Sequence, residues 1–161
     1  MSIPTGIDVP GGELVYRIGD LAPAPETLVV VNCAGRTRSI LGAESLRRAG
    51  IPNKVVALRN GTMGWELAGL TAARGETATY PAGRPATADL ALARAEAFAR
   101  EAGVRGIESA ALAGFAADDT RTLHVLDVRA PDEFAAAHAP GTRSAPGGQL
   151  VQATDRWIAT P

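Results

Sequence analysis

The one cysteine of this 161-residue chain lies where an apolar segment meets a short basic loop. A thiol becomes a nucleophile when nearby positive charge or a helix N-terminus lowers its pKa, because the thiolate is the reactive form. Cys33 is followed three and five residues later by Arg36 and Arg38, and Gly35 allows a tight turn before them. These residues predict a nucleophilic thiol inside a loop that attracts anions.

The elements on either side place this thiol at the start of a helix. Residues 28–31 are apolar at every position, which predicts a strand buried on both faces, as in a parallel sheet. Residues 39–49 have apolar side chains at helical spacing and end at Gly50. The free N–H groups and the dipole of that helix stabilise an anion at its start. Most free cysteines are inert buried hydrophobes, but this context favours a functional Cys33.

Three groups of motifs resemble the rhodanese-like sulfurtransferases. Residues 33–38, Cys-Ala-Gly-Arg-Thr-Arg, are similar to the active-site loop of that family, and Ser39 opens the helix that follows. Residues 55–65 resemble the strand and the glycine-then-tryptophan segment found after that loop. The opening half of the family, with its Asp-x-Arg strand end, acidic-aromatic helix and His-x-Pro-Gly turn, is matched by residues 125–129, 131–134 and 138–141.

The resemblance implies an α/β fold with a central parallel sheet and helices on both faces. It implies a two-step sulfur transfer in which Cys33 takes a sulfur from a donor such as thiosulfate, becomes a persulfide, and passes the sulfur to a thiol or cyanide. It implies neither a metal nor a cofactor. The loop residues expected to hold the anion and the persulfide are Ala34, Gly35, Arg36, Thr37 and Arg38, and the supporting residues are Ser39, Asp127, Arg129 and His138.

Several of these side chains have more than one interpretation. Arg38 either pairs with sulfite or fixes the shape of the loop, while Arg36 is expected to point outward toward an anionic donor. Thr37 is expected to offer a hydroxyl group to the loop.

The residues from the opening half are open to structural interpretations too. Asp127 and Arg129 form a structural ion pair, or Arg129 bonds Glu133 to hold the turn between strand and helix. His138 caps the turn before Pro140 or contacts the cysteine loop. His124 lies within an apolar segment and is expected to be a core histidine.

The two halves stand in the reverse of the family's order. Residues 2–15 also align with residues 138–151 at a constant offset of 136, sharing a Pro-Gly-Gly-x-Leu-Val core. We therefore expect the chain to begin inside one rhodanese-like repeat and end inside the next. The expected parts are a catalytic half at 1–73, a linker and spacer helix at 74–106, and the opening half of the next repeat at 107–161.

Half a parallel sheet cannot cover its apolar strands. We therefore predict one complete domain, built in circularly permuted order within the chain or by exchange between two chains as a homodimer. The sequence does not choose between these. One domain needs the Pro-Gly-Gly segment once, so one copy is expected to be displaced, frayed or engaged with a neighbour.

The connecting segments have simpler patterns. Residues 71–88 lack an apolar period and predict a linker. Other local patterns predict a helix at 88–102, a helix capped by Ser109 that runs to Phe115, a strand at 123–128 and a helix that starts at Pro131.

The composition of the chain limits the kinds of partner that it is expected to bind. With 16 Lys and Arg against 17 Asp and Glu, the net charge of −1 implies neither nucleic acid nor an anionic membrane as partner. The apolar runs are too short to span a bilayer, and residues 1–4 lack the basic start of a signal peptide. One cysteine cannot form an internal disulfide, so a cytoplasmic location is expected. The expected partners are a small sulfur-containing anion and a thiol acceptor.

Two other functions compete. Cysteine phosphatases and arsenate reductases use Cys-x5-Arg, a loop one residue longer than the Cys-x4-Arg of residues 33–38, and the shorter loop suits a single sulfur atom. A non-catalytic binding or sulfur-sensing module is the alternative from another class.

Overall fold

The computed structural model describes residues 1–158 of the chain. In the first half, the elements in order are α1 (Leu14–Leu21), β1 (Val29–Val31), α2 (Thr37–Arg48), β2 (Val55–Ala57) and α3 (Gly61–Leu67). The remainder is made of α4 (Ala88–Glu101), α5 (Ser109–Ala116), β3 (Leu126–Asp127), α6 (Pro131–Ala136), β4 (Arg143–Ser144), α7 (Gly147–Gln152) and a short 3₁₀ turn, Thr154–Arg156.

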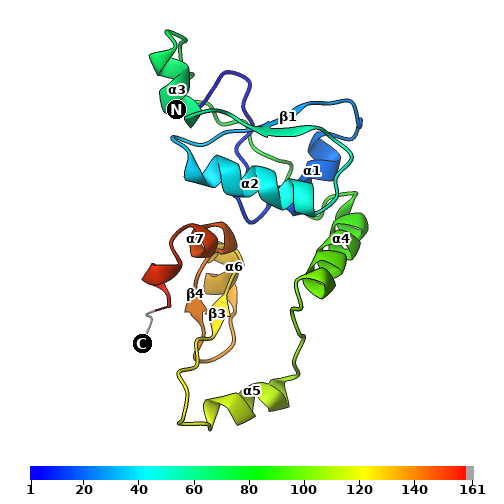
Figure 1. The fold of residues 1–161 in the computed structure, drawn as a ribbon, viewed down its shortest axis with the longest axis vertical. Helices are drawn as coiled ribbons and strands as arrows, with labels where there is room; N and C mark the ends of the chain where they lie inside the picture. The colour runs from blue at the N-terminus through cyan, green and yellow to red at the C-terminus, as the bar shows by residue number, and fades with distance from the viewer. Residues whose placement is uncertain (159–161) are drawn as a thin grey trace.

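The strands form two separate parallel pairs. β1 pairs with β2, with Val29 opposite Val55, and β3 pairs with β4, with Leu126 opposite Arg143. The pairs lie in different parts of the molecule, β1 with α2 above and β3 with α6 and α7 below (Figure 1). The prediction of parallel strands is confirmed. The single central sheet is not formed within residues 1–158, because β1 and β3 each keep one edge without a partner strand.

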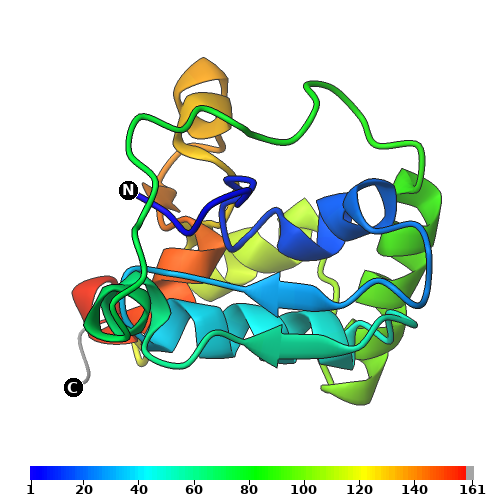
Figure 2. The ribbon, with the colours of Figure 1, turned by 90° about the horizontal axis from the view of Figure 1, so that it is seen from above.

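The core of the first half lies between α1, α2 and the inner face of β1. Leu46 of α2 is fully buried there, and Ile18 of α1 and Val31 of β1 are nearly so. Gly42 lets α1 and α2 pack closely, because a Cβ at this position would lie 2.7 Å from Leu14. This packing fixes α2, whose first turn follows the cysteine loop; Figure 2 shows α2 running alongside the strand pair.

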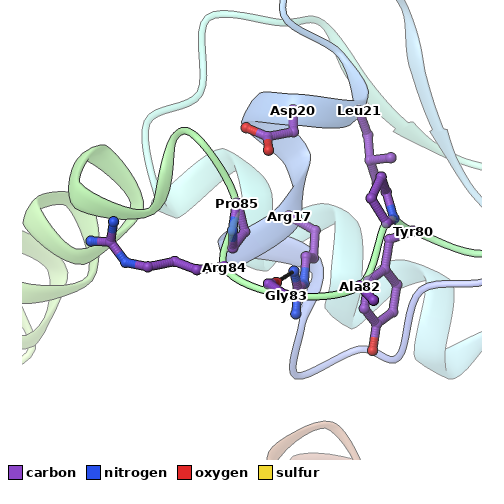
Figure 3. Close-up of a pocket in the computed structure, with 9 residues that line it drawn as sticks. Arg17, Asp20, Leu21, Tyr80, Ala82, Gly83, Arg84 and Pro85 are labelled. Atoms are coloured by element: carbon purple, nitrogen blue, oxygen red, sulfur yellow. Dashed lines mark hydrogen bonds between the residues drawn. The ribbon is translucent and has the colours of Figure 1, made fainter.

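The linker is held against α1 rather than hanging free. Arg17 of α1 stacks on Tyr80, with its guanidinium carbon 4.4 Å from the ring centre, and donates to the carbonyl of Gly83 (Figure 3). Asp20 accepts hydrogen bonds from the N–H groups of Ala86 and Thr87. A hydrogen bond from the Thr87 hydroxyl, followed by these two N–H bonds, holds the pKa of Asp20 below its ordinary value.

Three local predictions need correction, while the helix at 88–102 is confirmed by α4. Ser109 is the first residue of α5 and Glu108 precedes it with extended backbone angles, so Ser109 is not the cap. The strand expected at 123–128 is paired only over β3, since β4 offers just two residues. His124 falls outside that pairing and is exposed, so it is not a core histidine.

The two copies of the repeated segment begin with the same turn. Gly6 donates to the carbonyl of Ile3 at 3.2 Å, and 136 residues later Thr142 donates to that of Ala139 at 3.2 Å. Thr5 has a φ of 64° where its counterpart Gly141 has 79°. The first turn has lost its histidine and glycine, yet it keeps the fold of the second.

The equivalence continues into the helices. Glu13 donates to the carbonyl of Pro10 and Gln149 to that of Pro146, both at 2.8 Å. The copies lead into α1 and α7, so both begin helices, and engagement with a neighbour is the expected alternative that stays a prediction. The two copies touch each other: a Cβ on Gly148 would lie 3.3 Å from the Cα of Gly11.

Much apolar surface stays uncovered. The chain exposes 11042 Å², whereas a compact monomer of 16.5 kDa exposes about 7,600 Å². Leu28 and Val30, two residues apart and so on one face, are 52% and 42% exposed. The segment predicted to be buried on both faces is thus buried on one.

No helix within residues 1–158 has the length and apolar character needed to cross a membrane.

Candidate functional site

Cys33 lies directly after β1, two residues beyond Val31, in a loop that ends at the first turn of α2. No side chain caps this helix: Arg36 occupies the N-cap position without a side-chain hydrogen bond. The N–H groups of the first turn are therefore available to another acceptor. The predicted order of strand, cysteine loop and helix is confirmed, with the helix starting two residues earlier, at Thr37.

The Cys33 thiol lies beside these N–H groups and accepts from that of Ser39. Its Sγ donates to the hydroxyl oxygen of Ser39 at 3.5 Å, and this hydroxyl in turn donates to the carbonyl of Arg36 at 2.9 Å. Ser39 is only 1% exposed. Burial raises the pKa of the thiol, but hydrogen bonds outweigh it. Donors from the Ser39 hydroxyl, the Ser39 N–H and the Gly35 N–H, with the charge of Arg38, leave the pKa of Cys33 below its ordinary value.

The basic loop is open to solvent. The side chains of Arg36, Thr37 and Arg38 are exposed, Gly35 is half-buried, and Cys33 is also partly accessible. Two positively charged side chains are therefore accessible to an anion at this loop. The particular roles expected for these side chains stay predictions.

The first turn of α3 clamps the outside of the loop. Thr62 donates its N–H to the carbonyl of Cys33 at 2.9 Å, and Met63 donates to that of Ala34 at 3.0 Å. Gly61, with a φ of 58°, stands so close that a Cβ would collide with the carbonyl oxygens of Cys33 and Gly35. These three residues are functional candidates that the sequence analysis did not single out. The Asn60-Gly61 pair, a common left-handed dipeptide, was the available signal.

A buried amide joins the same clamp. Asn32 donates from Nδ2 to the hydroxyl of Thr62 at 3.1 Å, and that hydroxyl lies 3.4 Å from the carbonyl oxygen of Cys33. Thr62 is 2% exposed. Asn32 Oδ1 is buried and accepts no hydrogen bond from residues 1–158. The residue before the cysteine is therefore tied to the same turn that holds the loop.

Asp127 and Arg129 form the structural ion pair that was one of two interpretations. Arg129 donates from Nη2 to Asp127 Oδ2 at 2.6 Å and to the carbonyl of Ala137 at 2.7 Å. The hydrogen bonds from the Arg129 side chain and then from its N–H hold the pKa of Asp127 below its ordinary value. The alternative pairing of Arg129 with Glu133 is wrong, because Glu133 instead accepts the N–H of Ala130 at 3.0 Å.

His138 packs within the same half. Its Nδ1 lies 2.8 Å from the carbonyl oxygen of Phe134, and the two rings stack with centres 3.9 Å apart. The described side-chain hydrogen bonds of Asp127, Arg129 and His138 all stay within residues 127–138. The structure thus gathers Cys33, the loop and Ser39 into one site, and holds the other three expected residues around β3 and α6, apart from it (Figure 1).

Comparison with known proteins identifies a solved structure that resembles this chain. No family model matches the chain, and no curated protein matches it. A crystal structure of thiosulfate sulfurtransferase from Pseudomonas aeruginosa does match, with 55% sequence identity and a TM-score of 0.92. This chain is similar to a thiosulfate sulfurtransferase. The match covers 97% of the chain and 30% of that protein, so the chain spans less than a third of the solved protein's length.

The match agrees with the architecture described above. Small parallel strand pairs with helices packed beside them fit a rhodanese-like fold, and the 0.92 TM-score covers both halves of the chain. The 55% identity with a protein of this name agrees with the motif resemblance. Within residues 1–158 no group of three His, Cys, Asp or Glu side chains is arranged to hold a metal ion.

Proposed function

We propose that this chain carries the sulfur-transfer site of a rhodanese-type sulfurtransferase, with Cys33 as the sulfur carrier. The observation that carries the proposal is the setting of the thiol: N–H groups from Gly35 and Ser39 and the charge of Arg38 favour its thiolate form. The similarity to a thiosulfate sulfurtransferase supports the choice of a sulfur donor.

The first step is attack of the Cys33 thiolate on the outer sulfur of thiosulfate. A sulfur–sulfur bond forms to Cys33, the sulfur–sulfur bond of thiosulfate breaks, and sulfite leaves with the electron pair. The enzyme is left as a persulfide anion. Arg36 and Arg38 are exposed beside the thiol, where their charge attracts the doubly negative donor and stabilises departing sulfite.

In the second step an acceptor takes the outer sulfur. Cyanide attacks it, thiocyanate leaves, and the Cys33 thiolate is restored; a thiol acceptor forms its own persulfide in the same way. The N–H groups of residues 34–38 are proposed to surround the outer sulfur while it carries negative charge. A thiolate needs no general base, which fits a His138 whose Nδ1 is bonded to the carbonyl of Phe134.

Intact mass after incubation with thiosulfate tests the proposal. Wild type should gain one sulfur atom that cyanide removes with release of thiocyanate, and Cys33→Ser should gain none. The reduced wild type is confirmed first by complete reaction of its one thiol with iodoacetamide. A reactive thiol that takes no sulfur from thiosulfate, polysulfide or a small persulfide would overturn the proposal and favour the non-catalytic module.

We further propose that β1 and β3 are edges of one sheet, completed between two copies of the chain. The uncovered face of Leu28 and Val30, the free edges of both strands and the large exposed area support this exchange. The matching turns at Thr5 and Gly141 support the assignment of the two halves to successive repeats. The physiological donor, the acceptor and the cellular compartment are left to experiment, with a cytoplasmic location as the prediction.

A further inference from the structure

Two carbonyl groups of the cysteine loop are hydrogen-bonded to α3. The oxygen of Cys33 accepts the N–H of Thr62 at 2.9 Å, and the oxygen of Ala34 accepts that of Met63 at 3.0 Å. Both donors belong to the first turn of α3, where helix N–H groups have no partner within the helix. α3 has no side-chain cap, so the loop carbonyls take that place.

A trans peptide group is planar, and its C=O and N–H bonds point in opposite directions. The peptide that carries the Ala34 oxygen also carries the Gly35 N–H. A bond that draws the Ala34 oxygen outward to Met63 therefore turns the Gly35 N–H inward. That N–H is one of the donors to the Cys33 thiol. The same holds one residue earlier, where Thr62 draws the Cys33 oxygen outward and the Ala34 N–H turns into the loop.

These hydrogen bonds can form because the backbone of Gly61 lies directly against the cysteine loop. Gly61 has a φ of 58° and leaves no space for a Cβ between α3 and the loop. Asn32 fixes the hydroxyl of the buried Thr62 from the other side. The clamp is thus built from one turn that contributes no charge to the thiol and no side chain to the proposed donor.

We propose that the first turn of α3 is a positioning device for the Cys33 site: Thr62 and Met63, through their N–H groups, orient the loop peptides so that the amide of Gly35 faces the sulfur. The inference deepens the proposed sulfur transfer and rests on it for its biological meaning. Its physical content concerns the thiol alone and can be tested without any sulfur donor.

Met63 offers a matched pair of variants. Its side chain is 60% exposed, so Met63→Ala should leave the loop intact. Met63→Pro removes the N–H that holds Ala34, and because Met63 lies in the first turn of α3, no hydrogen bond within the helix is lost. Because Cys33 is the only cysteine, the alkylation rate and thiolate absorbance report on this site without interference.

We expect Met63→Pro to raise the midpoint of the alkylation–pH curve by about half a unit to one unit. That shift lowers the rate at neutral pH about three- to tenfold, since one pKa unit is a tenfold change in thiolate fraction. Met63→Ala should match wild type. An unchanged curve for folded Met63→Pro would overturn the proposal.

If Met63→Pro fails to fold, two variants of Thr62 test the proposal by the same alkylation measurement. Thr62→Val removes the hydroxyl that joins Asn32 to the loop, while Thr62→Ser keeps it. We expect a raised midpoint for the valine variant and recovery in the serine variant; equal midpoints in both would refute the role of this turn. Loss of sulfur loading with a normal alkylation curve would count against the proposed function instead, which keeps the two proposals distinguishable.

Discussion

Gly61 lies against the carbonyl oxygen of Cys33 with no room for a methyl group between them. A backbone contact of this kind joins the catalytic candidate to an element that begins 28 residues later in the chain. The loop is therefore held by contacts with α2 on one side and with α3 on the other.

Gly61→Ala should destabilise the chain by about 2 kcal/mol more than Gly69→Ala, because it adds a steric collision to the backbone strain. Both glycines have positive φ, 58° and 77°, but the space around Gly69 is open. Urea denaturation of both variants measures the difference. Equal losses would mean that the loop gives way easily and that α3 does not constrain it.

Ser39→Ala should raise the pKa of Cys33, because the Ser39 hydroxyl is one of the groups that lower it. We expect alkylation at neutral pH to slow about threefold or more. Ser45→Ala is the matched control: Ser45 lies on the same helix and donates to the carbonyl of Leu41, away from the thiol. If both serine variants react like wild type, the hydroxyl near Sγ has no influence on the thiolate.

The pH dependence of stability should show the lowered pKa of Cys33. The unfolded chain binds more protons between the folded and unfolded pKa values, so the free energy of unfolding rises with pH through that window. The contribution is complete above the unfolded pKa and is lost as the pH falls through the folded one. Denaturation of wild type and Cys33→Ser from about pH 6 to 9 should diverge in this direction. Parallel curves would contradict it.

Thr5→Gly should stabilise the chain by about 0.5–1 kcal/mol, since a β-branched residue is strained at a φ of 64°. Gly141→Ala, at the equivalent turn with open space around it, should cost about 1 kcal/mol. Thermal unfolding of both variants checks the pair. Opposite signs at the two positions would support one shared turn geometry; a destabilised Thr5→Gly would argue against strain at this residue.

The proposed exchange between copies predicts a dimer by light scattering. Val30→Lys, on the uncovered face of β1, should shift it to monomer, while Leu92→Lys on α4 should not, although Leu92 is also 58% exposed. A wild-type mass equal to one chain at all accessible concentrations would rule out the exchange.

The sequence determined the local architecture of the site. An apolar run before Cys33, basic residues after it and helical spacing beyond are all short-range signals, and β1, the loop and α2 follow them. The pairing of Asp127 with Arg129 was also within reach, because two residues at one strand end are close whatever the fold. Chain order and the offset of 136 residues likewise needed no coordinates.

Only the tertiary structure decided what surrounds the loop and what does not. Nothing in the local pattern shows that Met63 turns the peptide of Gly35, since that contact depends on how a later helix returns to the loop. The sheet itself was beyond reach for the same reason. Strand partners depend on non-local packing, so the chain forms two parallel pairs where its motifs predicted one sheet, and Asp127 and His138 stay with β3 and α6 rather than beside Cys33.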